Sequence, residues 1–166
     1  MQVRTAVITA AGFGTRFLPV SKAIPKEMLA LVDRPVIQYA VDQALEAGIN
    51  RIILVTSEGK ESMEAYFGIH SRLEEALEAR NSPKLAEVQR ISRMATIIPV
   101  IQEHPLGLGH AVLCAKEAVG NNPFIVYLTD EILLGQPSAT RQMLDSFERL
   151  GTSVIGVKQV PMNEVS

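Results

Sequence analysis

Residues 4–29 read "RTAVITAAGFGTRFLPVSKAIPKEML", a short apolar run followed by a glycine-rich turn and a basic, proline-rich segment. The run at 4–10 contains β-branched residues and ends at the turn, a pattern that predicts a buried strand. Later runs of the same character predict four further strands: "RIILVTS" (51–57), "TIIPVIQ" (96–102), "FIVYLTD" (124–130) and "TSVIGVKQV" (152–160).

Helical patterns separate these runs. Three of them end in glycine, as helices often do: "RPVIQYAVDQALEAG" (34–48), "GHAVLCAKEAVG" (109–120) and "SATRQMLDSFERLG" (138–151). The charged stretch 72–93 is also helical and breaks at 81–83, where Ser82 could cap a helix begun by Pro83. Apolar strands that alternate with helices predict an α/β fold, with a mostly parallel sheet and helices on both faces.

The composition narrows the class of protein. The chain has 166 residues, 47% of them hydrophobic and 20% charged, as is ordinary for one globular domain. Its net charge of -2 argues against nucleic acid or an anionic membrane as the main partner. Cys114 is the only cysteine, so no intrachain disulfide can form, and no apolar run approaches the length of a membrane span. We therefore expect a cytoplasmic protein.

The glycine turn is a candidate ligand site. In sheets of this class ligands bind beyond the carboxyl ends of the strands, so we expect functional residues after positions 10, 57, 102 and 130. The first loop lacks the Walker pattern G-x-x-x-x-G-K-[ST] and the third glycine of a dinucleotide fingerprint. Glycines nevertheless let a phosphate or base approach main-chain N–H groups, and nearby Arg and Lys supply positive charge. The pattern favours a phosphate site over a surface turn with unrelated charges.

The stretch "AAGFGTRFLPVSKAIPKEML" (10–29) resembles the signature of sugar-phosphate nucleotidyltransferases, which is G-x-G-T-R, then a Pro, then a Lys. "LVDRPVIQYAV", "RIILVTS" and "GLGHAVLCA" are similar to bacterial UTP–glucose-1-phosphate uridylyltransferases. The resemblance implies a Rossmann-like nucleotidyltransferase domain. It also implies Mg²⁺-dependent transfer of a uridylyl group from UTP to glucose 1-phosphate, giving UDP-glucose and pyrophosphate.

The resemblance assigns the phosphate chemistry to three residues. It implies that Arg16 faces the triphosphate and that Lys26 lies where the reacting phosphoryl group passes. Asp130 ends a buried strand and matches the family's metal-binding Asp, and a carboxylate there suits Mg²⁺. The neighbouring Thr129 departs from the Pro or Gly that is usual in the family. Fixed cations can stabilise an in-line displacement without a protein nucleophile.

Base recognition falls to other residues. The resemblance implies that the Ala11–Gly12 backbone lies against the base and ribose. Gln102 carries an amide that can donate and accept, as reading a uracil edge requires, and Gly107 permits close approach of the main chain. Glu27 could accept from the base or ribose, or it could be a helix-start carboxylate.

The resemblance also limits the activity that we expect from residues 1–166. We expect residues 1–166 to be the nucleotide-binding part of a nucleotidyltransferase domain, without the C-terminal part that carries most glucose 1-phosphate contacts. A fragment of a longer enzyme, a shortened non-catalytic nucleotide-binding module, and a nucleotidyltransferase for another sugar phosphate or nucleotide all stay open. The expected partners are UTP and glucose 1-phosphate, with no nucleic acid or membrane, and a full-length form is expected to be a homo-oligomer. His110 is expected to start a helix rather than to bind metal, since no partner stands at ligand spacing.

Overall fold

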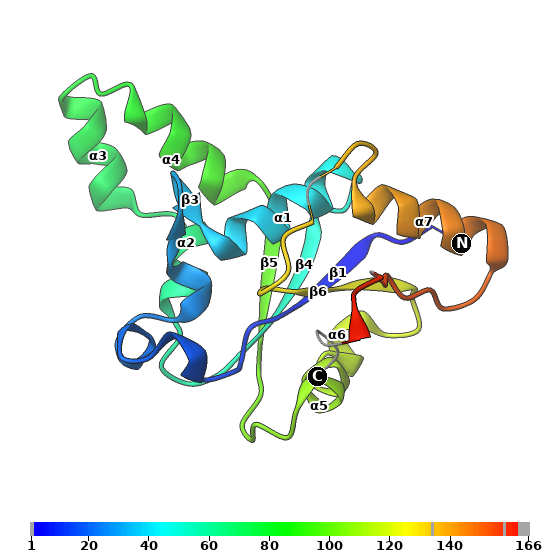
Figure 1. Cartoon of the computed structure of the whole chain (residues 1–166). Helices are drawn as coiled ribbons and strands as arrows, with labels where there is room; N and C mark the ends of the chain where they lie inside the picture. The colour runs from blue at the N-terminus through cyan, green and yellow to red at the C-terminus, as the bar shows by residue number, and fades with distance from the viewer. Residues whose placement is uncertain (1, 134, 158, 163–166) are drawn as a thin grey trace.

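A computed structural model describes residues 2–133, 135–157 and 159–162 (Figure 1). Its main sheet has four parallel strands, in the order β5 (Thr96–Ile101), β4 (Arg51–Thr56), β1 (Thr5–Thr9) and β6 (Phe124–Leu128). The central strand β1 pairs Thr5 with Arg51 of β4 on one side and with Phe124 of β6 on the other. These four strands were predicted from their apolar runs, and the α/β class with a mostly parallel sheet is confirmed.

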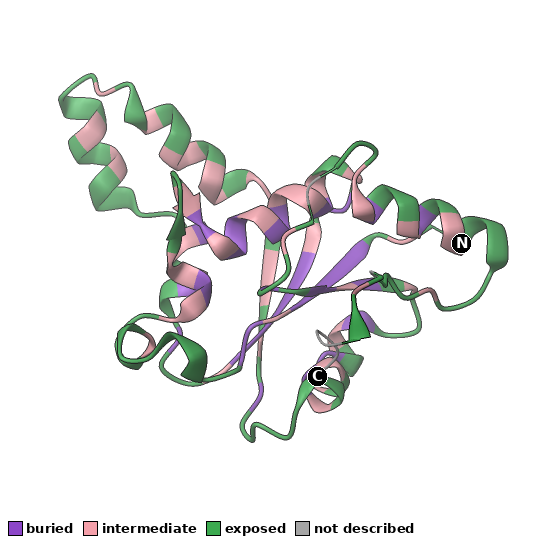
Figure 2. Cartoon of the chain, viewed as in Figure 1, coloured by how far each residue is buried: buried purple, intermediate pink, exposed green. Residues whose placement is uncertain are grey.

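Alternation along β1 divides the core between the two faces of the sheet. The fully buried Ala6 and Ile8 face α1 (Val36–Glu46), α2 (Ser62–Phe67) and α7 (Ala139–Leu150). Val7 faces the other side, where α5 (Leu108–Cys114) and α6 (Lys116–Val119) cover the sheet (Figures 1 and 2). Successive strand side chains point to opposite faces, so an unbroken apolar run is what a doubly covered strand requires.

The remaining elements lie outside this layered core. Helices α3 (Ser71–Ala79) and α4 (Lys84–Arg93) form a projecting hairpin without a fully buried residue (Figure 2). At its bend the Ser82 hydroxyl accepts from the Lys84 N–H at 3.3 Å, but α4 begins at Lys84 with Pro83 as its N-cap residue, one position later than predicted. The other elements are short: the 3₁₀ turns η1 (Thr15–Phe17), η2 (Val20–Lys22) and η3 (Lys26–Met28), and the antiparallel pair β2 (Ala30–Leu31) and β3 (Arg34–Pro35).

Two predicted elements differ from the structure. The strand predicted at 152–160 is wrong, because the described residues of that segment pair with no strand and expose Ile155 and Val157 by more than 80%. Apolar alternation gives β propensity, but a strand also needs a neighbouring edge and a surface against which to pack. The single helix predicted at 109–120 is divided at Ala115, where a ψ of -6° departs from α-helical geometry and ends α5.

Parallel pairing decides where the functional loops lie. All four strands of the main sheet run in one direction, so their carboxyl ends share one edge. The loops that follow Thr9, Thr56, Ile101 and Leu128 therefore emerge at the same edge. These are the loops that the sequence singled out, and they hold the site described next.

Candidate functional site

A cluster of opposite charges joins the ends of β1 and β6. Arg16 Nη2 lies 3.1 Å from Asp130 Oδ2, and Lys26 Nζ lies 3.7 Å from the same oxygen. The Lys26 side chain is 17% exposed and that of Arg16 is 84% exposed. One carboxylate therefore holds two cations from the glycine-rich segment, one of them well enclosed and the other free to swing toward solvent. The structure brings these three predicted residues together.

Gly14 allows this segment to fold closely on itself. Its φ of +64° lies in the left-handed region, and a Cβ at this position would come within 3.2 Å of Lys26 Cβ. The Ser21 hydroxyl donates to the Gly14 carbonyl at 2.8 Å and closes the turn. A side chain at position 14 would strain the backbone and crowd the Cβ and Cγ atoms of Lys26, so glycine here allows Lys26 to pack against the turn.

A buried lysine ties the glycine loop to Glu27. Lys60 Nζ donates to the carbonyl oxygens of Ala10 and Gly12 at 2.6 Å each, and to Glu27 Oε2 at 3.0 Å. The Glu27 side chain is fully buried, and Oε1, its other oxygen, has no hydrogen bond from the residues that the structure describes. A buried carboxylate of this kind needs a counter-charge, which Lys60 supplies.

Sequence reasoning missed Lys60. Functional residues are expected after position 57, but Lys60 lies in the polar stretch "SEGKES" (57–62), whose composition predicts an exposed, solvated lysine. Its position four residues beyond the end of β4, at the carboxyl edge of the sheet, is the signal that could have identified it. Glu27 lies in the first turn of η3, as the helix-start alternative expects, and it is also 1% exposed and ion-paired with Lys60.

A small cavity of about 150 Å³ opens beside the charge cluster. Lys26 and Asp130 line it on the polar side, and its other walls are Phe17, Leu29, Val36, Thr129 and Ile132. The Thr129 hydroxyl donates to the Thr9 carbonyl at 3.5 Å, so the residue that departs from the family pattern bonds across to β1. The cavity suits a small charged group with one apolar side.

The predicted base-reading pair also meets. Gln102, which is 6% exposed, follows β5, and its side-chain nitrogen lies 3.4 Å from the Gly107 carbonyl oxygen and 2.9 Å from His110 Nδ1. Gly107 has a φ of +95°, which favours glycine, and it directly precedes α5. The main chain of Gln102 donates to Thr56 at 2.7 Å, which fixes this loop to the end of β4.

A divalent metal would find only one carboxylate beside the cavity. The described residues include no group of three or more His, Cys, Asp or Glu side chains placed to hold a metal. The Asp130 side chain is 39% exposed, and both cations contact Oδ2, one of its two oxygens. A single carboxylate fits Mg²⁺, which is usually held by one or two carboxylates together with substrate phosphates.

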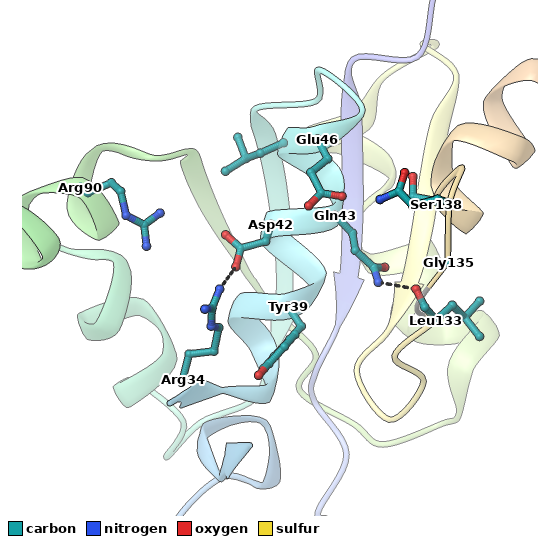
Figure 3. A pocket seen from close by; sticks show the side chains of 11 residues that line it. Arg34, Tyr39, Asp42, Gln43, Glu46, Arg90, Leu133, Gly135 and Ser138 are labelled. Atoms are coloured by element: carbon teal, nitrogen blue, oxygen red, sulfur yellow. Dashed lines mark hydrogen bonds and ion pairs between the residues drawn. The ribbon is translucent and has the colours of Figure 1, made fainter. Parts of the chain in front are cut away.

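A larger groove, of about 900 Å³, lies away from this cluster, between α1 and the loop before α7 (Figure 3). Arg34 pairs there with Asp42 at 3.1 Å and with Asp33 at 3.0 Å, and these carboxylates raise its pKa above the ordinary value. The hydrogen bond from Arg34 in turn lowers the pKa of Asp33. Because Arg34 is already paired with two carboxylates, it is not free to bind an anionic ligand, and size alone does not make this groove the functional site.

Comparison with known proteins decides the family. Residues 5–164 match the family described as Nucleotidyl transferase. The chain belongs to that family. The resemblance found in the glycine-rich stretch is thereby confirmed, and the loops that it singled out are those of a nucleotidyl transferase.

Individual relatives agree with this assignment. The nucleotidyl transferase chain is 47% identical over 164 residues to the UTP–glucose-1-phosphate uridylyltransferase of Bacillus subtilis (strain 168), covering 98% of this chain and 56% of that protein. A UTP-bound UGPase from Acinetobacter baumannii matches with a TM-score of 0.83 at 44% identity, over 90% of this chain and 54% of that one. A UDP-glucose pyrophosphorylase complexed with UDP-glucose matches with a TM-score of 0.84 at 38% identity, over 99% and 61%. The chain thus spans little more than half the length of these relatives.

Proposed function

We propose that this chain binds UTP at the loops after β1, β5 and β6 and contributes them to uridylyl transfer. The reaction joins UTP and glucose 1-phosphate to give UDP-glucose and pyrophosphate. The sugar phosphate oxygen forms a bond to the α-phosphorus of UTP while the bond from that phosphorus to the pyrophosphate oxygen breaks. The proposal rests on the convergence of Arg16, Lys26 and Asp130 on one point, at distances of 3.1 and 3.7 Å.

The two cations would act on the phosphates. The Arg16 side chain is 84% exposed, so it can leave Asp130 and offer its planar fork to the oxygens of the triphosphate. Lys26 is enclosed beside the cavity and can place a point charge on the transferring phosphoryl group. The Lys26 charge is held by the fold before the substrate arrives, and preorganised charge of this kind is how a transfer without a protein nucleophile is accelerated.

Asp130 would be the residue that holds a divalent cation, for which Mg²⁺ is our choice. When UTP takes Arg16 and Lys26, the Asp130 carboxylate loses both partners and becomes available to a metal. Bound Mg²⁺ would neutralise part of the charge on the phosphates. The chain's own contribution is the position of one carboxylate at the end of β6.

The base would be held by the other loops. The main chain at Ala11 and Gly12 approaches it, and Gln102 and Gly107 read its edge. Glu27 is buried and held by Lys60, so in this arrangement it supports the loop and accepts from the ribose only if the loop opens.

Binding and transfer are tested in one series of proteins. UTP affinity is measured by calorimetry for the wild type, Arg16→Ala and Lys26→Ala, with Arg141→Ala as the matched control. Arg141 pairs with Asp145 at 2.8 Å on the surface of α7, so its loss removes a similar exposed ion pair. Charge-assisted contacts to phosphate are worth roughly 1.5–3 kcal/mol, so each site variant should bind UTP about ten- to hundredfold more weakly at an unchanged melting temperature.

Transfer is followed as pyrophosphate release that depends on glucose 1-phosphate. Release that is independent of the sugar phosphate, or unchanged UTP affinity in both site variants, would contradict the proposal. We expect UTP binding by residues 1–166 with transfer far below that of a longer form, because positioning of the acceptor can lower a barrier by roughly 7–11 kcal/mol.

Three expectations stay predictions alongside this function. They are that residues 1–166 form the nucleotide-binding part of the domain, that a full-length form is a homo-oligomer, and that the protein is cytoplasmic. Light scattering of a longer form tests the second, and fractionation of the source cells tests the third. For the described residues, no helix combines the length and apolar character that crossing a bilayer would require.

A further inference from the structure

The amide of Gln102 is held in one orientation by two neighbours. Its nitrogen, Nε2, lies 3.4 Å from the Gly107 carbonyl oxygen and 2.9 Å from His110 Nδ1. A carbonyl oxygen only accepts hydrogen bonds, so the nitrogen of the amide, and not the oxygen, belongs in this corner. Gln102 is 6% exposed and lies between the end of β5 and the first turn of α5.

This orientation defines the tautomer of His110. An amide nitrogen only donates, so Nδ1 of His110 must accept, and the neutral ring then carries its proton on Nε2. The Cys114 sulfur lies 3.9 Å from the same Nδ1 and can only add a weak S–H donor to it. Both neighbours of Nδ1 are therefore donors, and His110 serves as the acceptor between them.

The oxygen of the Gln102 amide is left for a ligand. Within the part of the chain that the structure describes, no hydrogen bond reaches this Oε1 atom, and it is not among the buried side-chain atoms without a partner, which are Glu27 Oε1 and Thr56 Oγ1. An accessible acceptor complements the N3–H of uracil, which donates. The same oxygen would be repelled by the N3 of cytosine, because that atom is also a hydrogen-bond acceptor.

We infer that His110 is a specificity-determining positioning residue, which selects a uracil-type base over cytosine by fixing the Gln102 amide with its oxygen outward. Without the acceptor at His110 Nδ1, only the longer 3.4 Å contact to the Gly107 carbonyl opposes a half-turn of the amide, which would present its nitrogen to the base. An amide in that orientation would match cytosine. The inference rests on the proposed function, because it needs a nucleotide base at this loop.

The test compares affinities for UTP and CTP at about pH 8, where ordinary imidazoles are neutral. Both nucleotides carry the same triphosphate, so the ratio of their affinities reports the base alone. His110→Leu removes the acceptor and should lower the UTP preference by about tenfold. His110→Asp returns a group that only accepts and should restore the preference. His104→Leu, on an exposed residue of the same loop, is the control and should leave it unchanged.

The outcomes separate this inference from the proposed function. If His110→Leu binds UTP with the wild-type preference over CTP, the inference is wrong while the function stands. If the wild type binds neither nucleotide, the function fails and the selection of a base fails with it. Nitrogen-15 NMR of the wild-type imidazole needs no variant and no nucleotide: a proton on Nε2 of His110 is expected, and a neutral ring protonated on Nδ1 would overturn the inference.

Discussion

Lys60 offers a sharp test of how the nucleotide loop is held. Replacing it by Met keeps most of the aliphatic stem and removes the ammonium. Three contacts are lost together, to the carbonyls of Ala10 and Gly12 and to the carboxylate of Glu27. Glu27 is then fully buried with no hydrogen bond to either oxygen, and the nearest remaining cation is Lys26, at 4.0 Å.

The expected loss follows from that burial. Removing one partner of a buried ion pair costs about 3–5 kcal/mol, because the other charge is left without compensation. Domains are stable by roughly 5–15 kcal/mol, so Lys60→Met should remove a large share of the free energy of unfolding. The pair Lys84–Glu87 is the control: it has the same 3.0 Å separation but is more than half exposed on both sides, and Lys84→Met should cost at most about 1 kcal/mol.

Urea denaturation followed by circular dichroism measures both variants. The double variant Lys60→Met/Glu27→Gln removes the orphaned charge and should recover part of the loss, so the two changes should not add. If Lys60→Met costs no more than Lys84→Met, or if the double variant loses the sum of the single ones, the buried pair does not hold the loop and the reasoning is refuted.

Three further variants probe separate parts of the structure. Asp130→Asn keeps the shape of the side chain, so Mg²⁺ should no longer strengthen UTP binding in calorimetry, while metal-free affinity changes little; an unaltered metal effect would reject Asp130 as the ligand. Burial raises the pKa of Tyr127 to about 12. Because the unfolded chain ionises this phenol near pH 10, the stability of the fold that depends on neutral Tyr127 is complete below about pH 10 and is lost as the pH rises toward about 12. Phenylalanine does not ionise, so the free energy of unfolding of Tyr127→Phe should fall by roughly 2–3 kcal/mol less than that of the wild type over this pH range. An unchanged pH profile of unfolding would contradict this expectation. Val32 is 92% exposed at a φ of +64°, where a β-branched residue is strained, so Val32→Asn should gain about 1 kcal/mol in urea denaturation and a loss would be the contrary result.

Much of the fold could be predicted because its signals are local. A strand covered on both faces must be apolar at every position, so the runs around Val7 and Ile53 identify β1 and β4 without knowledge of their neighbours. Two helix ends are also predictable from the sequence, because Gly48 and Gly151 take left-handed φ angles just beyond α1 and α7. The segment at 152–160 misled the same reasoning, because pairing depends on a neighbour that composition does not reveal.

The candidate site was predictable in residue types more than in contacts. Arg16, Lys26 and Asp130 were identified from a motif and a strand end, and their meeting follows from parallel pairing. Lys60 was missed because its role arises from burial against Glu27, which lies far from it in the sequence. The contact between Gln102 and His110 was hidden for a similar reason: it depends on how the loop after β5 turns into α5, and no residue pattern encodes that turn.

The central position of β1 has a consequence for the order in which the molecule can assemble. Strand β1 gains its second neighbour in the sheet only when Phe124–Leu128 has been synthesised, and the pair Arg16–Asp130 spans 114 positions. Such distant contacts carry a loop-closure cost that the α3–α4 hairpin does not, since its helices are adjacent in the chain. The hairpin can therefore form early, whereas Arg16 and Lys26 of the glycine-rich segment have no contact with Asp130 until β6 has paired with β1. The charge cluster becomes complete only in the closing stage of folding, so a chain that stops before Asp130 has the signature sequence without the carboxylate that joins Arg16 and Lys26.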